Sequence, residues 1–97
     1  MKVEIVSPQQ KLLDTEADMV AVPGINGEFA MLDNHAPIIA LLEKGTVRVQ
    51  GKNLHVDEDN ESFFQHEKTK DKEQLKLPIK SGTVEMNNNR VIILVEL

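Results

Sequence analysis

Few residues of this chain could do chemistry, because it has three histidines and no cysteine. The best metal-binding pattern is His55-x-Asp57-x-Asp59, whose side chains would share one face of a strand. An EF-hand loop starting at Asp57 is excluded, since its sixth position is Ser62 instead of glycine and its twelfth is Lys68 instead of glutamate. An acidic loop that meets solvent is the simpler interpretation. We therefore predict no metal site and no cofactor.

The chain also lacks the residue patterns that nucleophilic catalysis needs. Acyl transfer needs a nucleophile on a sharp turn, with a histidine and a carboxylate within reach. The three serines, Ser7, Ser62 and Ser81, lie outside any Gly-x-Ser-x-Gly pattern, and no glycine-rich stretch continues into the lysine and hydroxyl of a phosphate loop. Asp33 and His35 could pair, but residues two positions apart around a turn more often cap a loop. We predict that the chain is not an enzyme.

Composition narrows the class of protein further. The net charge is −5 with only 11 Lys and Arg among 97 residues, so no basic face is expected and a nucleic-acid partner is disfavoured. The absence of cysteine excludes disulfides and suits a reducing compartment. We expect no secretory signal, and the longest apolar run, residues 36–42, is far shorter than the ~20 residues of a membrane-spanning helix. We expect one soluble domain of residues 1–97, with a core of Val, Ile, Leu and Met.

The elements that must position any site are strands, because apolar and polar residues alternate with a period of two. Strands are predicted over residues 2–5, 11–13, 19–22, 28–32, 46–50, 75–79, 83–86 and 90–94. Turn signals separate them, notably Asn26-Gly27 and residues 87–89, three consecutive asparagines. Pro78 indicates an edge or bulged strand, and the apolar run of residues 91–95 indicates a last strand buried on both faces. The pattern predicts an all-β sandwich or barrel.

One segment does not fit this alternation. Residues 51–74 hold seven of the 16 acidic and four of the 11 basic residues. A core cannot be made from them, so we predict a solvated loop or protruding hairpin. Within it, residues 54–56 could extend the preceding strand's hairpin, and residues 61–74 could form a helical turn or two with Phe63 and Phe64 against the sandwich.

A composite loop, residues 23–37, stands out instead of a catalytic motif. It combines two turns with Glu28, Phe29 and a histidine, His35, that precedes Ala-Pro. Taken alone, these residues are explained by turns and packing, since glycine and proline supply the backbone conformations that turns need.

The loop and its surroundings carry a resemblance to a known family, the epsilon subunit of F-type ATP synthase (delta in mitochondrial naming). The resemblance covers roughly three quarters of the chain. The matching residues are Val3-Glu4-Ile5-Val6-Ser7-Pro8, Ala17-Asp18-Met19-Val20, Pro23-Gly24, Gly27-Glu28-Phe29-Ala30-Met31-Leu32, Asn34-His35-Ala36-Pro37, Leu42, Gly45, Val47, Arg48, Ser81-Gly82-x-Val84-Glu85-Met86 and Asn89-Arg90-Val91.

The resemblance implies a flattened β-sandwich of about ten strands, corresponding to that family's N-terminal domain. It further implies a non-catalytic rotor subunit of the central stalk, which links the gamma subunit to the c-ring and couples proton flow to ATP synthesis. Carried over, Gly27, Glu28, Asn34 and His35 lie on the c-ring-facing loops. Exposed apolar positions are the candidates for the gamma-facing surface, and we name Met31, Ile38 and Met86.

The resemblance also implies a location and some departures. We expect peripheral association with the cytoplasmic face of the bacterial inner membrane, through the complex. Ala30 replaces the family's usual glycine, Ser81 replaces the first residue of a Gly-Gly pair, and the segment 51–74 is longer than usual. The sequence stops at Leu97, without the family's C-terminal helical hairpin, so we expect neither ATP binding nor inhibition of hydrolysis. The alternative is a stand-alone β-sandwich that binds another protein.

Overall fold

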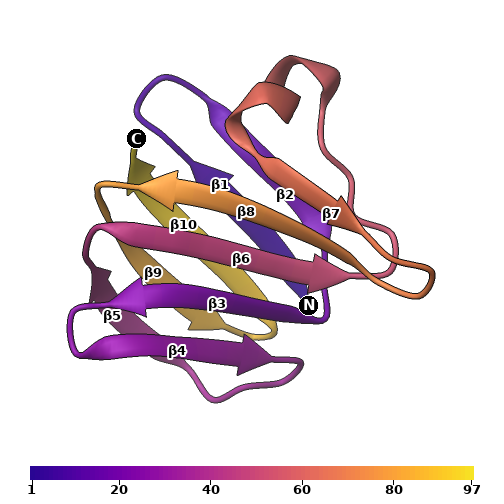
Figure 1. Cartoon of the computed structure of the whole chain (residues 1–97). Helices are drawn as coiled ribbons and strands as arrows, with labels where there is room; N and C mark the ends of the chain where they lie inside the picture. The colour runs from indigo at the N-terminus through magenta and orange to yellow at the C-terminus, as the bar shows by residue number, and fades with distance from the viewer.

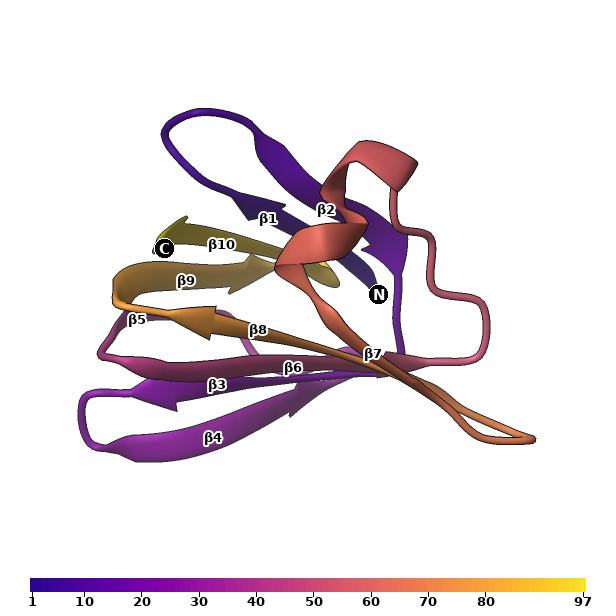
Figure 2. The same ribbon diagram turned by 45° about the horizontal axis from the view of Figure 1, so that its top comes forward.

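The computed structural model describes all 97 residues and forms two packed layers of strands with one short helix (Figures 1 and 2). The strands are β1 (Lys2–Val6), β2 (Lys11–Glu16), β3 (Met19–Gly24), β4 (Gly27–Leu32), β5 (Ile38–Leu42), β6 (Gly45–Gly51), β7 (Gln65–Lys68), β8 (Glu73–Ile79), β9 (Ser81–Asn87) and β10 (Arg90–Glu96). A 3-10 helix, η1, spans Glu58–Phe63. The predicted all-β sandwich of about ten strands is confirmed, and no helix has the length and hydrophobicity needed to cross a membrane.

The strands run β2-β1-β10-β9-β5 in one layer and β4-β3-β6-β8-β7 in the other. A single bridge between Gly24 and Leu42 joins β3 to β5 and makes the two layers one curled sheet. Only β1 and β10 pair in parallel, and every other pair is antiparallel. Figure 2 shows the layers nearly edge-on, with β1, β9 and β10 above β3, β4 and β6.

Turn chemistry places the strand ends as the sequence indicates. Asn88 and Asn89 have φ values of 51° and 59°, so the β9–β10 hairpin closes through two left-handed residues. Gly27 has a φ of 117°, which an L side chain rarely adopts, at the start of β4. Pro78 pairs with Thr46 on β6 but lies beyond the last residue of β8 that pairs with β7. It therefore occupies a free edge, as predicted.

The core is one cluster of 20 buried residues between the layers, built from Val, Ile, Leu, Met and Ala. No aromatic side chain belongs to it, and Phe29 and Phe64 only pack against its margin. The prediction of an aliphatic core is therefore confirmed.

The charged segment 51–74 is more ordered than its composition suggests. The helical turn forms over Glu58–Phe63, earlier than predicted, and Leu54 and Val56 pack against the core without forming a strand. Phe64 packs against the core, whereas Phe63 is 37% exposed. The segment's second half is a hairpin of β7 and β8 whose tip extends beyond the layers (Figures 1 and 2).

The prediction that the last strand is buried on both faces is wrong. In β10, Val91, Ile93 and Val95 are buried, but Ile92 is only half-buried and Leu94 is 51% exposed. The reason is architectural, because the sandwich has two layers and nothing within this chain covers the outer face of β10. An apolar outer face on an inner strand therefore needs another explanation.

Candidate functional site

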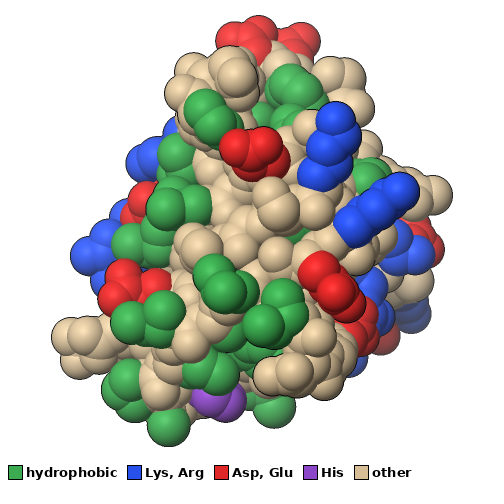
Figure 3. Space-filling model, turned by 90° about the vertical axis from the view of Figure 1, so that its left-hand side faces the viewer, with side chains coloured by type: hydrophobic (Ala, Val, Ile, Leu, Met, Phe, Trp, Pro, Cys, Tyr) green, Lys and Arg blue, Asp and Glu red, His purple; other side chains and the backbone are tan.

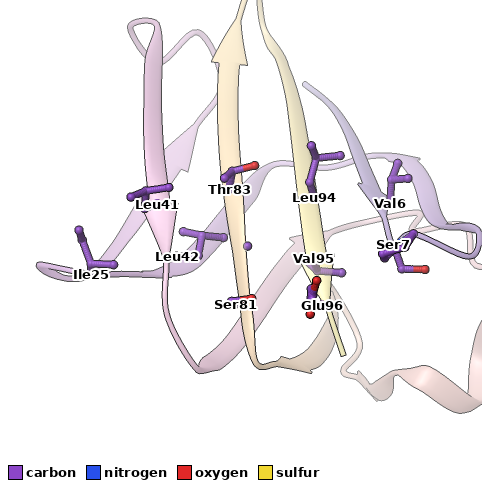
Figure 4. A pocket seen from close by; sticks show the side chains of 12 residues that line it. Val6, Ser7, Ile25, Leu41, Leu42, Ser81, Thr83, Leu94, Val95 and Glu96 are labelled. Carbon is purple, nitrogen blue, oxygen red and sulfur yellow. The ribbon is translucent and has the colours of Figure 1, made fainter.

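Apolar side chains form a row across the outer face of the β5-β9-β10-β1 layer. The backbone register pairs Leu41 with Thr83, Thr83 with Leu94, and Leu94 with Val6. Cross-strand partners have their Cβ atoms about 5 Å apart, so these side chains are direct neighbours. Figure 4 shows the four side chains at one level on the four strands.

A shallow groove of about 690 Å³ follows this row at one end of the sandwich. Its lining residues are Val6, Ser7, Pro8, Ile25, Leu41, Leu42, Ser81, Gly82, Thr83, Leu94, Val95 and Glu96. Gly82 lies in contact with the backbone of β10, because a Cβ there would stand 2.4 Å from the carbonyl oxygen of Leu94. Figure 3 views this end of the molecule and shows hydrophobic side chains along its left-hand and lower parts.

The same outer face becomes charged away from the groove. Glu4 on β1 lies near Arg90 and Lys11, at 3.2 Å and 3.5 Å, and Asp14 on β2 lies near Lys2 and Lys11, at 3.7 Å and 3.5 Å. The partners of Glu4 and both members of the Asp14 pairs are exposed, although the Glu4 side chain itself is only 15% exposed, so each pair contributes about 1 kcal/mol or less to folding. An apolar strip beside a charged border is the arrangement of a protein-binding surface.

The turn between β3 and β4 lies at the groove end of the molecule (Figure 1). Ile25 at its tip is 53% exposed and lines the groove. Just beyond the turn, Arg48 Nη2 on β6 donates to Glu28 Oε1 at 2.6 Å. Because β3 separates β4 from β6, this ion pair spans the outer face over the middle strand. Glu28 is therefore a paired carboxylate rather than a free one.

Asn34 and His35 lie beyond the opposite end of β4, so the structure does not bring them together with Gly27 and Glu28 (Figure 1). The Asn34 N–H donates to Asn89 Oδ1 at 2.8 Å, which ties this loop to the β9–β10 hairpin. The His35 N–H donates to the carbonyl oxygen of Leu32 at 3.0 Å. The two predicted c-ring-facing loops are thus at different ends of the sandwich.

The expectation that Met31 and Met86 are exposed is wrong. Met31 is 0% and Met86 1% exposed, and both belong to the core. Each occupies an inward position of an alternating strand, where a flexible thioether fills space between the layers. Ile38 is half-buried against the core. Of the three candidates, only Ile38 keeps some surface.

The titratable groups form ion pairs rather than a reactive cluster. His55 Nε2 lies 3.0 Å from Asp57 Oδ1, but Asp59 adds no third ligand, and no group of three His, Asp or Glu side chains is placed to hold a metal. Lys76 Nζ lies 2.6 Å from Glu67 Oε1, and this bond lowers the pKa of Glu67 below its usual value. These contacts hold neighbouring segments together.

The residues of the groove were missed individually by sequence reasoning. The reason is that Val6, Leu41 and Leu94 lie in strands whose apolar residues are normally predicted to be buried in the core. The available signal was the loss of alternation in residues 91–95, since an inner strand that is apolar on both faces must have each face covered.

Comparison with known proteins adds three findings. The sequence profile of the family described as "ATP synthase, Delta/Epsilon chain, beta-sandwich domain" matches residues 1–61. An ATP synthase epsilon chain of Maridesulfovibrio salexigens is 34% identical over 94 residues, which are 97% of this chain and 53% of that protein. An ATP synthase epsilon chain of Desulforamulus reducens is 30% identical over 95 residues, 98% of this chain and 58% of that protein. This chain therefore spans little more than half the length of these relatives.

A solved structure agrees with the fold. A chain of the Tetrahymena thermophila mitochondrial ATP synthase central stalk and c-ring superimposes with a TM-score of 0.69 over 100% of this chain and 63% of that chain. The sequence identity is 12%, so this likeness concerns the fold alone.

Proposed function

Because this chain belongs to the family of ATP synthase delta and epsilon β-sandwich domains, we propose that it is a non-catalytic subunit of the central stalk of the F-type ATP synthase. In this role it links the gamma subunit to the c-ring and couples ion flow to ATP synthesis. It is peripheral to the membrane, at the cytoplasmic face of the bacterial inner membrane, through its partners.

The apolar row of Val6, Leu41 and Leu94 is the observation that carries this proposal, and we assign it to the gamma subunit. Leu94 lies on β10, an inner strand of its layer, yet its side chain is about half exposed. In this proposal the gamma subunit covers that side chain in the assembled complex. The charged border around Glu4 and Lys11 then sets orientation more than affinity, as rim charges do.

The c-ring contact is assigned to the end that carries Gly27 and Glu28. This turn projects from the groove end of the sandwich, where it can meet polar loops while the adjacent face holds gamma. The Arg48 partner keeps the Glu28 side chain in one position, which favours a fixed register over raw attraction. The loop of Asn34 and His35, at the other end of β4, is then directed away from the ring.

A close-packed sandwich suits the transmission of torque, because protein interiors deform little under load. The single aliphatic core of 20 residues joins the gamma-facing surface to the c-ring-facing turn as one body.

Single thiols test the assignment, since the chain contains no cysteine. We would introduce Leu94→Cys, Glu28→Cys and His35→Cys separately, treat membranes of the source organism with a short thiol-to-amine crosslinker, and identify adducts by mass spectrometry. Leu94→Cys is expected to yield a gamma adduct and Glu28→Cys a c-subunit adduct. Position 35 is the matched control at the opposite end of β4, with no c-subunit adduct expected.

Two results would contradict the proposal. A c-subunit adduct from position 35 with none from position 28 would reverse the orientation. Recovery of the chain in the soluble fraction, with membrane ATP synthesis unchanged on its deletion, would favour the stand-alone binding module instead.

A further inference from the structure

One carboxylate lies within the apolar part of the outer face of the β5-β9-β10-β1 layer. Glu85 is on β9, and the register places Ile39 of β5 on one side of it and Ile92 of β10 on the other. Side chains directly opposite each other share a face of the sheet, so all three point away from the core, as Leu94 does. Ile39 is 77% exposed, and Glu85 is exposed as well. The carboxylate therefore has aliphatic neighbours on both adjacent strands.

Glu85 also has two aliphatic neighbours on the diagonal. The next pairs along the strands join Leu41 to Thr83 and Thr83 to Leu94, and Figure 4 shows the two leucines on either side of Thr83. Both leucines are thus diagonal to Glu85, about 7–8 Å away in ordinary sheet geometry. A partner surface that covers both Leu94 on β10 and Ile39 on β5 has to cross β9 at Thr83 and Glu85.

No cation of this chain neutralises Glu85. Its side chain forms neither an ion pair nor a hydrogen bond in the structure. The basic residue closest to it in the register is Arg90, which is opposite Asn87 and diagonal to Glu85. Arg90 Nη2 instead contacts Glu4 Oε1 at 3.2 Å. Since the Glu4 side chain is only 15% exposed, moving Arg90 to Glu85 would weaken a partly buried pair.

Water stabilises this carboxylate only while the face is open. Taking an ionised carboxylate out of water without a counter-charge costs more free energy than covering Leu94 returns. A neutral partner surface would therefore bind this face poorly. A basic side chain placed over Glu85 would offset the lost hydration, and arginine fits best, because its guanidinium can donate to both carboxylate oxygens while its aliphatic stem packs on the neighbouring isoleucines.

We propose that the gamma subunit places a basic side chain over Glu85, and that this ion pair within an aliphatic surround makes Glu85 a specificity-determining residue of the interface. This inference rests on the proposed function, which assigns the face to gamma. A partner without the basic group is rejected, because it would bury the carboxylate unpaired.

The charges of the face favour such a partner over a second copy of this chain. The basic residues on the strands of this layer are Lys2, Lys11 and Arg90, and each is already paired with Glu4 or Asp14. A second copy therefore has no free cation on the same face to offer. The net charge of −5 also opposes self-association.

Glu85→Gln distinguishes a paired from an unpaired carboxylate in the complex, because the two cases change affinity in opposite directions. If gamma supplies a cation, the amide leaves that cation unpaired, and affinity for recombinant gamma should fall at least tenfold in a calorimetric titration. If no cation faces Glu85, the amide removes a desolvation cost, and affinity is unchanged or rises. Glu85→Lys should weaken binding at least 100-fold, since two cations would then meet.

Glu58→Gln is the matched control. It makes the same change of net charge at an exposed residue of η1 and should leave affinity for gamma within twofold. Circular dichroism should show all three variants folded, because both glutamates are exposed and unpaired.

Charge-swapped partners identify the basic residue. Each lysine and arginine of gamma is changed to glutamate in turn, and each gamma variant is titrated with the Glu85→Lys chain. We expect one gamma variant to bind this chain at least tenfold more tightly than unaltered gamma does. A merely structural role of Glu85 would not produce such a rescue, and its absence from every gamma variant would overturn the inference.

The remaining outcomes separate this inference from the proposed function. If Leu94→Ala weakens binding to gamma but Glu85→Gln does not, the ion pair is overturned and the assignment of the face to gamma stands. An equal loss in the Glu58 variant would show a long-range effect of net charge and would also overturn the pair. If the unaltered chain does not bind gamma, both are overturned. A dimer of this chain that Glu85→Gln dissociates would make the occupant a second copy and overturn the inference as stated.

Discussion

Truncating Leu94 tests whether the apolar row binds the gamma subunit. Fully burying a leucine side chain is worth about 1.5–3 kcal/mol, so covering the 51% that Leu94 exposes is worth about 0.8–1.5 kcal/mol. Leu94→Ala should therefore weaken binding to gamma about four- to twelvefold, at about 1.4 kcal/mol per tenfold. The variant should stay folded at 25 °C, because the loss is small beside a typical total stability of about 5–15 kcal/mol.

The assay is calorimetric titration of the purified chain with the recombinant gamma subunit of the same organism. Phe63→Ala is the matched control: Phe63 is 37% exposed on η1 and does not line the groove, so its truncation removes apolar surface elsewhere. Equal affinity of the Leu94 variant and the unaltered chain, within twofold, would refute the assignment of this face to gamma. An equal loss in the Phe63 variant would show that the effect is not local.

Three further substitutions test the structure around the site. Gly82→Ala should lower the free energy of unfolding by about 1–3 kcal/mol, because its Cβ would stand 2.4 Å from the carbonyl oxygen of Leu94. The thermal midpoint should fall by about 4–8 °C for each kcal/mol lost, and an unchanged melting curve would contradict that contact. Asn60→Ala should lower the free energy of unfolding in urea by about 0.5–1.5 kcal/mol, because it removes the part-buried hydrogen bond to the carbonyl oxygen of Lys11, while affinity for gamma stays the same. Lys76→Met should raise the pKa of Glu67 toward its usual 4.5, as measured by an NMR titration. In the unaltered chain the pKa of Glu67 is lower in the folded than in the unfolded state. The ion pair therefore stabilises the fold above about pH 4.5, and this stabilisation is lost as the pH falls.

Most of the fold could be predicted from the sequence because strand alternation and turn residues are local signals. The hairpin of Asn88 and Asn89 is an example, since asparagine tolerates the left-handed backbone better than other residues with a side chain. The free edge at Pro78 is another, because proline cannot donate to a ladder. The segment 51–64 was less predictable, since its order comes from long-range contacts such as that of Asn60 with Lys11.

The candidate site was harder to predict, because alternation tells which residues share a face but not which face is covered. Met31 and Met86 were expected at the surface and lie in the core, whereas Leu41 and Leu94, in equally apolar strands, lie outside. The separation of Glu28 from His35, by contrast, follows from the strand predicted over residues 28–32, since one residue begins this strand and the other lies beyond its end.

The apolar run of residues 91–95 was interpreted wrongly for this chain in isolation, yet its physical basis holds. A strand in the middle of a sheet gains from apolar residues on both faces only when both faces leave water. The second layer covers Val91, Ile93 and Val95. Ile92 and Leu94 point to the opposite face of β10, which no other part of this chain covers. If gamma supplies it, β10 is a doubly buried strand in the assembled complex, and the sequence describes the assembly rather than the isolated chain.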